Sequence, residues 1–383
     1  MPHALGRIAA ERVDAPEALP AFARSTMDGF AVRAAETYGA SDSAPAYLRL
    51  AGEVAMGRVA RDPLEVGTAQ RIHTGAMLPP LADAVVIVED TTLRGSELEV
   101  LRAVAPGDNA VAVGEDVGAG EPIVCAGREL RAQDLGALHA AGVTALRVRR
   151  RPVVGILSSG DEVVAPDAAT PLGAVRDVNA VTVGATVERA GGIPRYLGIV
   201  PDDEARLFAA ARAGLEACDA LVLSAGSSVS ARDLTARVVE RLGPPGILVH
   251  GIALRPGKPT ILAVAAGKPV VGLPGNTVSA LVVAWRMVRP MVRLLAGASL
   301  ASGGWDEDRT LDVRLTATVP SRPGREDYVP VALRRAADGA LEATPVFGKS
   351  SLIFTLVRSD ALLVVPLDLA GYAAGSVAKA IVT

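Results

Sequence analysis

The middle of the chain carries the pattern that most constrains its fold. Across residues 152–295, short apolar runs alternate with segments of helical period, and the runs are PVVGILS, PRYLGIV, ALVLSAG and PVVGLPG. Runs that are apolar throughout are typical of strands buried on both faces of a parallel sheet. Helical segments lie between and after them, which is the order of repeated β–α–β units. The pattern predicts an open parallel α/β sheet whose ligands bind at the carboxyl ends of its strands.

The flanking regions have a different pattern of apolar and turn residues. In residues 45–129, Val-rich runs such as ADAVVIVED and ELEVLRAV alternate with turn clusters, which predicts a β-rich domain. Residues 130–148 carry the spacing of one short helix, and RVRRRP then marks a charged junction. Alternation returns after residue 304 and predicts a β-barrel-like C-terminal domain. We therefore expect four domains: residues 1–44 with 130–150 as a helical dimerisation and linker domain, 45–129, 151–300, and 306–383.

Composition excludes several classes of function. The 39 Lys and Arg against 42 Asp and Glu give a net charge of −3, so no nucleic-acid partner is expected. The 5 Phe, 5 Tyr and 2 Trp are too few for base-stacking platforms. The longest apolar stretch, residues 269–285, contains PGN and two Pro, so it is not interpreted as a membrane span. The first residues do not resemble a signal peptide. We expect a cytoplasmic protein.

Cysteine and histidine do not indicate a metal or nucleophile site. The chain has 2 Cys and 4 His, scattered without ligand spacing. The histidines stand apart in sequence from the acid-bearing loops, so no Ser-His-Asp or Cys-His arrangement is expected. His250, in ILVHGIAL, is interpreted as a strand residue.

Four loops at predicted strand ends carry the candidate chemistry. SSGDE places Asp161 and Glu162 after the first strand, although a solvated turn at Gly160 explains the same residues. SAGSSVSARD has the small residues of an anion-binding loop and ends on Asp233, which a plain helix cap also explains. It matches neither a Walker A sequence nor a GxGxxG fingerprint.

The other two loops add cations and a cap. RPGKP brackets a Pro-Gly turn with Arg255 and Lys258, which suits a phosphate or another oxyanion as well as a solvated basic turn. LPGNTVSA places Asn276 to cap the helix that follows. Further polar loops carry Asp28 and Thr74, and GED adds Asp116. Together these features indicate metal-assisted cleavage or transfer of a phosphoanhydride.

The motifs, in their order, resemble the MoeA family of molybdopterin molybdenumtransferases, to which the gephyrin E domain belongs. LPAFARSTMDGFAVR is similar to its SAMDGYAV segment, RIHTGAMLPPLADAVVIVED to RIxTGAxxPxxADAVVxxE, and GEDVGAGEPIV to GEDIxxG. SSGDE resembles STGDE, VRDVNA resembles YDxN, and SAGSSVSARD resembles SGGVSVGxxD. RPGKP and GLPGNTVSA resemble KPGKP and GLPGNPVSA. The resemblance covers nearly the whole chain.

The resemblance implies insertion of molybdenum from molybdate into adenylylated molybdopterin, with release of AMP and dependence on Mg²⁺ or a similar divalent cation. It implies an α/β domain like that of MogA, a homodimer, and a MogA-type adenylyltransferase as a partner. Its implied catalytic residues are Asp28, Thr74, Asp116, Glu162, Asp202 and Asp233, of which Glu162 and Asp233 are the implied metal ligands. Its implied substrate contacts are Ser224, Gly226, Ser228, Arg255, Lys258, Pro274, Ser279, Arg325 and Ser350.

The chain departs from the family pattern in its anion loops. Gly251 stands where relatives have a Lys, Arg255 replaces a Lys, and Thr277 replaces a Pro. Ala225, Ser227 and Ser230 change the SGGVSVG segment. The usual first helix has no counterpart, because Gly6-Arg7 already matches the motif after it. Either a start codon lies upstream, or the dimer depends mainly on residues 5–13 and 130–148.

Two alternatives stay open at this point. One is a related enzyme on the same sheet, either a tungsten-inserting paralogue or a pterin-binding nucleotidyltransferase or hydrolase. The other is a binding or scaffold protein without activity. The presence of Asp28, Glu162, Asp233 and Lys258 disfavours the scaffold, because an inactive site need not keep both metal and phosphate ligands.

Overall fold

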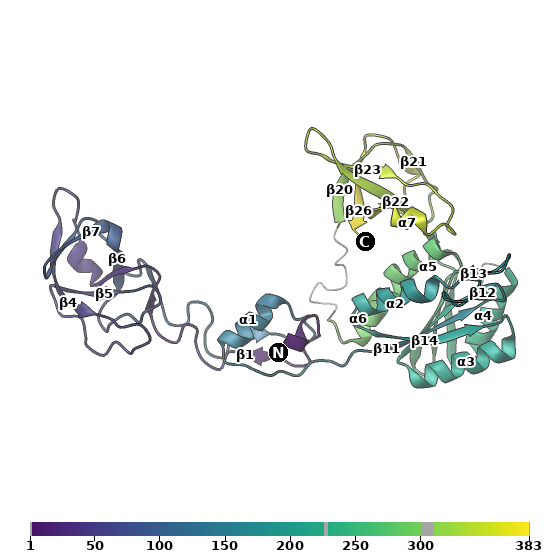
Figure 1. The fold of residues 1–383 in the computed structure, drawn as a ribbon, viewed down its shortest axis with the longest axis horizontal. Coiled ribbons are helices and arrows are strands. Elements are labelled where there is room, and N and C mark those ends of the chain that lie inside the picture. The colour runs from purple at the N-terminus through teal and green to yellow at the C-terminus, as the bar shows by residue number, and fades with distance from the viewer. Residues whose placement is uncertain (1, 226–228, 300–309, 383) are drawn as a thin grey trace. The chain divides into compact units, whose positions relative to one another are not determined.

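The computed structural model describes residues 2–225, 229–299 and 310–382 (Figure 1). The chain divides into two compact units, each with its own hydrophobic core. The first unit comprises Met1–Leu5, Glu11–Ala126 and Leu130–Leu146, and the second comprises Gly6–Ala10, Gly127–Glu129 and Arg147–Thr383. The division into four domains is finer than these two units and stays a prediction.

The first unit is built around a six-stranded sheet in the order β6-β3-β5-β4-β8-β7. Its strands are β3 (Gly29–Val32), β4 (Ala46–Glu53), β5 (Thr68–Ile72), β6 (Ala84–Ile87), β7 (Thr91–Arg94) and β8 (Glu97–Val100). Only β4 and β5 pair in parallel. Phe30 and Leu98 belong to one buried cluster of this sheet, and Ile72 and Val85 belong to another. Apolar side chains therefore cover both faces of the sheet.

Short elements complete the first unit. β1 (Val13–Asp14) pairs with β10 (Pro122–Val124), and β2 (Arg24–Ser25) pairs with β9 (Ala110–Val111). The 3-10 helices are Pro2–Ala4, Ala34–Thr37 and Val88–Asp90. The helix predicted within residues 130–148 is confirmed as α1, Ala132–Ala140. It begins where the Asp134 carboxylate accepts a hydrogen bond from the Arg131 amide at 2.9 Å, as a side chain in a first turn often does.

The second unit contains the expected α/β sheet, in the order β14-β11-β15-β19-β18-β16. The strands are β11 (Val153–Ser159), β14 (Ile193–Val200), β15 (Ala220–Ser224), β16 (Pro245–His250), β18 (Ile261–Ala265) and β19 (Lys268–Leu273). The four apolar runs identified in the sequence form the four parallel strands, and His250 is confirmed as a strand residue. A short parallel pair, β12 (Val163–Val164) and β13 (Val175–Arg176), lies beside this order.

The sheet is parallel across four strands only. β18 and β16 extend it in antiparallel fashion, so the complete sheet is mixed rather than wholly parallel. The reason is local: Ala266 and Gly267 both adopt positive φ, and two such residues form the tight turn of a β-hairpin between β18 and β19. A hairpin returns the chain antiparallel without a crossover helix.

Helices cover both faces of this sheet (Figure 1). They are α2 (Asn179–Arg189), α3 (Glu204–Ala217), α4 (Val229–Arg241), α5 (Thr277–Val283) and α6 (Arg289–Leu295). One core cluster joins the sheet to α2, α5 and α6, and a second joins it to α3 and α4. A π-helical segment, Ala284–Val288, connects α5 to α6 just before Pro290, which lacks the amide that a regular helix needs there.

The C-terminal segment closes into a barrel, as predicted. Strands β22, β23, β20, β26 and β24 pair in a ring, because β24 also pairs with β22. Their bounds are β20 (Thr310–Leu315), β22 (Glu326–Arg335), β23 (Leu341–Pro345), β24 (Ala361–Val365) and β26 (Val377–Val382). A minor pair, β21 (Val319–Pro320) and β25 (Gly371–Tyr372), and helix α7 (Phe354–Val357) complete it. β17 (Leu254–Arg255) pairs in parallel with β22 and so joins the α/β segment to the barrel.

Within the described residues, no helix has the length and apolar character that crossing a membrane requires.

Candidate functional site

The RPGKP turn is rigid because its glycine is buried. Gly257 has a φ of 137°, and a Cβ there would lie 2.6 Å from Val283 Cγ2. Any other residue would clash at this point. The Thr260 hydroxyl also donates a hydrogen bond to the Gly257 carbonyl at 2.7 Å. The turn therefore presents Arg255 and Lys258, both exposed, from a fixed backbone.

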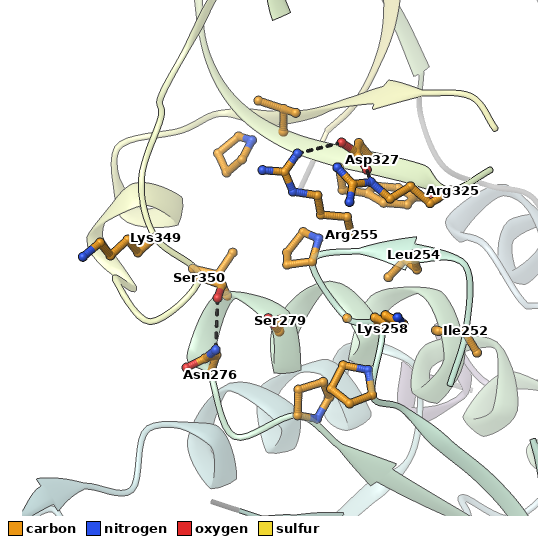
Figure 2. Close-up of a pocket in the computed structure, with 18 of the residues that line it drawn as sticks. Ile252, Leu254, Arg255, Lys258, Asn276, Ser279, Arg325, Asp327, Lys349 and Ser350 are labelled. Carbon is orange, nitrogen blue, oxygen red and sulfur yellow. Dashed lines mark hydrogen bonds and ion pairs between the residues drawn. The ribbon is translucent and has the colours of Figure 1, made fainter. Parts of the chain in front are cut away.

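A cavity of about 1280 Å³ opens at this turn, between loops of the α/β sheet and the barrel (Figure 2). Among the described residues, four cationic side chains line it, and Asp327 is the one acidic residue of the lining. Those cations are Arg255, Lys258, Arg325 and Lys349. Such an excess of positive charge in a concave site attracts anions. The structure brings six predicted substrate contacts to this cavity: Arg255, Lys258, Pro274, Ser279, Arg325 and Ser350.

Asp327 joins two of these cations. Its carboxylate accepts a hydrogen bond from Arg255 Nη1 at 3.1 Å and another from Arg325 Nε at 2.9 Å (Figure 2). The Asp327 side chain is only 2% exposed, whereas that of Arg255 is 57% exposed. A carboxylate this buried requires charged partners. Asp327 was not predicted as a site residue. Nothing in the local sequence of residues 325–328, REDY, indicates that Asp327 contacts a turn 72 residues earlier in the chain.

Ser350 binds the loop before α5. Asn276 Nδ2 donates to Ser350 Oγ at 3.1 Å, and the Val278 amide donates to the Ser350 carbonyl at 2.9 Å (Figure 2). Asn276 does occupy the residue before α5, but its side chain makes no capping hydrogen bond. The expected cap is therefore wrong, because the barrel loop at Ser350 takes both the amide of the helix and the side chain of Asn276. These contacts fix one wall of the cavity.

A second charged group, the acidic cluster, lies at the ends of β11 and β14. The Asp202 amide donates to Asp161 Oδ1 at 3.1 Å. Partial burial raises the pKa of Asp202, and the negative charges of Asp161 and Glu162 raise it further. Gly160 has a φ of 148°, which confirms the positive-φ turn expected there. The structure thus brings the predicted residues Glu162 and Asp202 into one repulsive group, together with Asp161.

Ser224 lies at the end of β15, the next strand of the sheet, and is buried. It accepts a hydrogen bond from Asn179 Nδ2 at 2.8 Å, and the same amide donates to the Gly275 carbonyl at 3.0 Å. Asn179 Oδ1 and Ser158 Oγ are buried without a hydrogen-bond partner among the described residues. Asn179 was not among the predicted site residues, although the VRDVNA motif contains it.

The remaining residues of that loop are less completely described. Gly226 and Ser228 were predicted substrate contacts and lie outside the described residues. Asp233 lies on α4 and is exposed. Within the described residues, no group of three or more His, Cys, Asp or Glu side chains is arranged to hold a metal ion.

The first unit holds the other three predicted residues. Asp28 Oδ1 accepts hydrogen bonds from the Thr74 amide at 2.7 Å and the Thr74 hydroxyl at 2.9 Å. These two bonds lower the pKa of Asp28, the backbone bond most. Asp116 is exposed, and its amide donates to the Leu19 carbonyl at 3.0 Å. The structure pairs Asp28 with Thr74 but shows no bond from either to Asp116 among the described contacts.

The expectation that histidines lie apart from the acidic loops is wrong for His73. Its Nε2 lies 2.7 Å from Glu53 Oε1, and its Nδ1 lies 3.9 Å from Asp28 Oδ1. Glu53 lies on β4, and Asp28 lies in the loop before β3. Both strands pair with β5, and this pairing was not visible in the sequence. His73 stands directly before Thr74, so it belongs to the same loop as a predicted site residue.

Three family models match the chain in succession. Residues 1–142 match the MoeA N-terminal region (domain I and II), residues 155–294 match a probable molybdopterin binding domain, and residues 312–383 match the MoeA C-terminal region (domain IV). The order and extent of these matches follow the motifs identified in the sequence.

Relatives and solved structures agree with those matches over almost the full length. A putative molybdopterin biosynthesis protein of Methanocaldococcus jannaschii is 31% identical and covers 97% of this chain and 88% of its own. The molybdopterin molybdenumtransferase of Bacillus subtilis is 32% identical, with 97% and 86% covered. A crystal structure of a molybdopterin biosynthesis MoeA protein from Pyrococcus horikoshii is 27% identical, covers 100% and 93%, and has a TM-score of 0.83. With such identity over nearly all of both sequences, the chain belongs to the MoeA family of molybdopterin biosynthesis proteins.

Proposed function

We propose that this chain is a molybdopterin molybdenumtransferase that inserts molybdenum from molybdate into adenylylated molybdopterin and releases AMP. The observation that carries the proposal is the cavity with four cations and one carboxylate, present in a chain whose relatives bear this name. Molybdate is a tetrahedral dianion, and the substrate carries a phosphoanhydride, so both need fixed cationic donors.

The cavity residues offer three kinds of donor to an anion: guanidinium, ammonium and hydroxyl groups. Arg255 and Arg325 offer planar N–H forks that suit two oxygens of one anion, while Lys258 offers a point charge. Ser279, which is buried in the wall, and Ser350 offer hydroxyl groups beside them. Together these groups would bind and orient an oxyanion and compensate its charge.

We further propose that Glu162 and Asp233 hold a divalent ion of the Mg²⁺ type. Mg²⁺ prefers oxygen ligands and is usually held by one or two carboxylates together with waters and substrate phosphates. Glu162 supplies one such carboxylate, and it lies beside Asp161 and Asp202, where the like charges help raise the pKa of Asp202. When bound, the ion would neutralise charge on the phosphoanhydride.

We also propose a cytoplasmic homodimer supplied by a MogA-type adenylyltransferase, because the substrate must already carry its adenylyl group. Asp28 and Arg325 belong to different units of the chain, so a dimer would allow each subunit to supply one of them. Light scattering is expected to report a dimer. Mixed subunits carrying Asp28→Asn and Arg325→Ala are expected to recover part of the activity that each variant lacks. A fully active monomer at micromolar concentration contradicts the shared site.

One assay tests the activity directly. Purified protein is incubated with adenylylated molybdopterin, a divalent cation and molybdate, and AMP is followed by chromatography. Oxyanion-dependent AMP release is the expected result, and reactions without oxyanion are the control. A parallel reaction with tungstate separates a molybdenum-inserting enzyme from a tungsten-inserting one. AMP release that ignores both oxyanions would indicate a nucleotidyl hydrolase instead.

A further inference from the structure

We infer that Asp327 is a positioning residue of the anion cavity: its carboxylate holds Arg255 and Arg325 in the arrangement that receives an oxyanion. The inference rests on the proposed function and deepens it, because it names what organises the cations of that site. Asp327 would act through the two arginines rather than on the substrate.

The first support is the geometry of the carboxylate. Each of its oxygens serves one arginine: Oδ2 accepts from Arg255 Nη1, and Oδ1 accepts from Arg325 Nε (Figure 2). A guanidinium carries five N–H donors, and each bond to Asp327 uses one of them. The other donors of both groups remain for an oxyanion in the cavity that the two side chains line.

The second support is that the contact joins two parts of the second unit. Arg255 belongs to β17, which leaves the α/β segment, and Asp327 belongs to β22 of the barrel. The same two residues are also partners in the parallel pairing of β17 with β22. Backbone and side chain therefore fix Arg255 to the barrel at one point, and Arg325 lies two residues before Asp327, directly ahead of the first residue of β22.

The third support is the contrast in burial. The side chain of Asp327 is 2% exposed, that of Arg325 is 33% exposed, and that of Arg255 is 57% exposed. An exposed arginine has many rotamers, and an anion must order it on binding unless the protein has already done so. A buried acceptor with little freedom of its own supplies that order in advance. It also separates two like charges that would otherwise repel each other.

A competing role for Asp327 predicts the opposite change in oxyanion affinity. Asp327 is an anion, so it could simply occupy the two arginines and compete with the ligand. Under that role, removal of its charge strengthens oxyanion binding. Under the positioning role, removal weakens binding because the guanidinium groups lose their orientation. A measurement of affinity therefore separates the two roles by direction.

The barrel provides a matched control. Glu342 also accepts from two arginines, Arg314 at 2.9 Å and Arg334 at 2.8 Å, and it does not line the cavity. Glu342→Gln removes the same charge from the same kind of two-arginine pair in the same domain. A change seen in Asp327→Asn and absent from Glu342→Gln is specific to the cavity.

The test measures binding of molybdate alone, and of inorganic phosphate alone, to the full chain by calorimetry. The salt concentration is about 150 mM, which screens the bulk effect of one lost charge. Asp327→Asn and Asp327→Glu are each expected to weaken molybdate binding about 10-fold, which is about 1.4 kcal/mol. Asp327→Glu is informative because it keeps the charge and moves the carboxylate. Glu342→Gln is expected to keep the wild-type Kd.

Steady-state kinetics separate a positioning role from a general loss of stability, because partial unfolding would lower kcat without raising KM for molybdate. In the AMP-release assay, KM for molybdate is expected to rise in both Asp327 variants while kcat changes less. Wild-type or tighter binding in Asp327→Asn overturns the inference. If that variant does not fold, Asp327→Glu decides, and wild-type affinity there overturns it equally. A wild-type chain that binds molybdate but releases no AMP contradicts the proposed function and leaves this inference standing.

Discussion

The second unit contains two groups of charged side chains, the anion cavity and the acidic cluster, and they differ in how their acids are surrounded. In the cavity, the carboxylate of Asp327 is buried and compensated by Arg255 and Arg325. In the acidic cluster, partial burial raises the pKa of Asp202, and the like charges of Asp161 and Glu162 raise it further. The first site pairs its acid with cations, whereas the second gathers acids of like charge.

This difference has a physical meaning. A buried charge is tolerated only when partners satisfy it, so the arrangement around Asp327 is preorganised before any ligand arrives. Acids that repel one another at the surface gain most when a cation or a cationic ligand joins them. We therefore expect the cavity to determine anion affinity and the acidic cluster to determine dependence on a divalent ion.

The largest effect is expected from the proposed metal ligands. Glu162→Gln and Asp233→Asn should each lower AMP release by about 100-fold or more, because the ion that neutralises the phosphoanhydride loses a ligand. The measurement is AMP release over a range of Mg²⁺ concentrations, with circular dichroism to check the fold. Asp312→Asn, an exposed acid paired with Lys379 at 3.1 Å in the barrel, is the control. Wild-type turnover by either variant would refute its assignment.

The cavity should respond next. Lys258→Ala is expected to raise KM for molybdate about 10-fold, the size of one lost charged contact. Arg255→Ala should cost less, because Asp327 already compensates part of the charge of Arg255, whereas Gly251 provides no further cation beside Lys258. Steady-state AMP release against molybdate concentration measures both. An unchanged molybdate dependence in Lys258→Ala would contradict the role of the basic turn.

Asp219 is an acid that lies in neither site and is paired with a cation, so it tests whether an ion pair without a ligand-binding role stabilises the fold. Asp219 accepts from Arg150 and from the Val153 amide, and the bond from Arg150 is the main cause that lowers its pKa to about 2. Asp219→Asn should reduce the free energy of unfolding by about 1–2 kcal/mol at neutral pH. Because the folded pKa is depressed, this stabilisation is present above the ordinary pKa of 3.8 and is lost as the pH falls toward 2. Chemical denaturation of both proteins between pH 2 and 7, about the range of this titration, measures it.

The smallest effect is expected at Asp202 and has the opposite sign. Its pKa is raised, so the ionised carboxylate is disfavoured in the folded state. The cost begins as the pH rises above the ordinary value of 3.8 and is complete above the raised value. Asp202→Asn should raise Tm on the order of 1 °C at neutral pH in metal-free buffer. The gain should vanish below the ordinary value of 3.8, where the acid is protonated in both states. Destabilisation at neutral pH would contradict the view of this cluster as repulsive.

The sequence predicted the elements well where a pattern has one structural meaning. The four apolar runs became β11, β14, β15 and β19, and the helical spacings became α2 to α6, because burial on both faces and a period of 3.6 residues are local properties. The antiparallel edge of the sheet was not predicted. It depends on a two-residue turn at Ala266 and Gly267 that a run of apolar residues conceals.

By itself, the sequence determined the order of the motifs, the excess of candidate anion ligands and the family resemblance, since these reside in residue types and their spacing. Only the tertiary structure decided which of them meet. It placed Asp327 between Arg255 and Arg325, directed Asn276 to Ser350 instead of a helix cap, and brought His73 to Glu53 and Asp28. Each of these contacts joins residues from different strands or loops, and strand pairing, which brings distant segments together, is not encoded in local spacing.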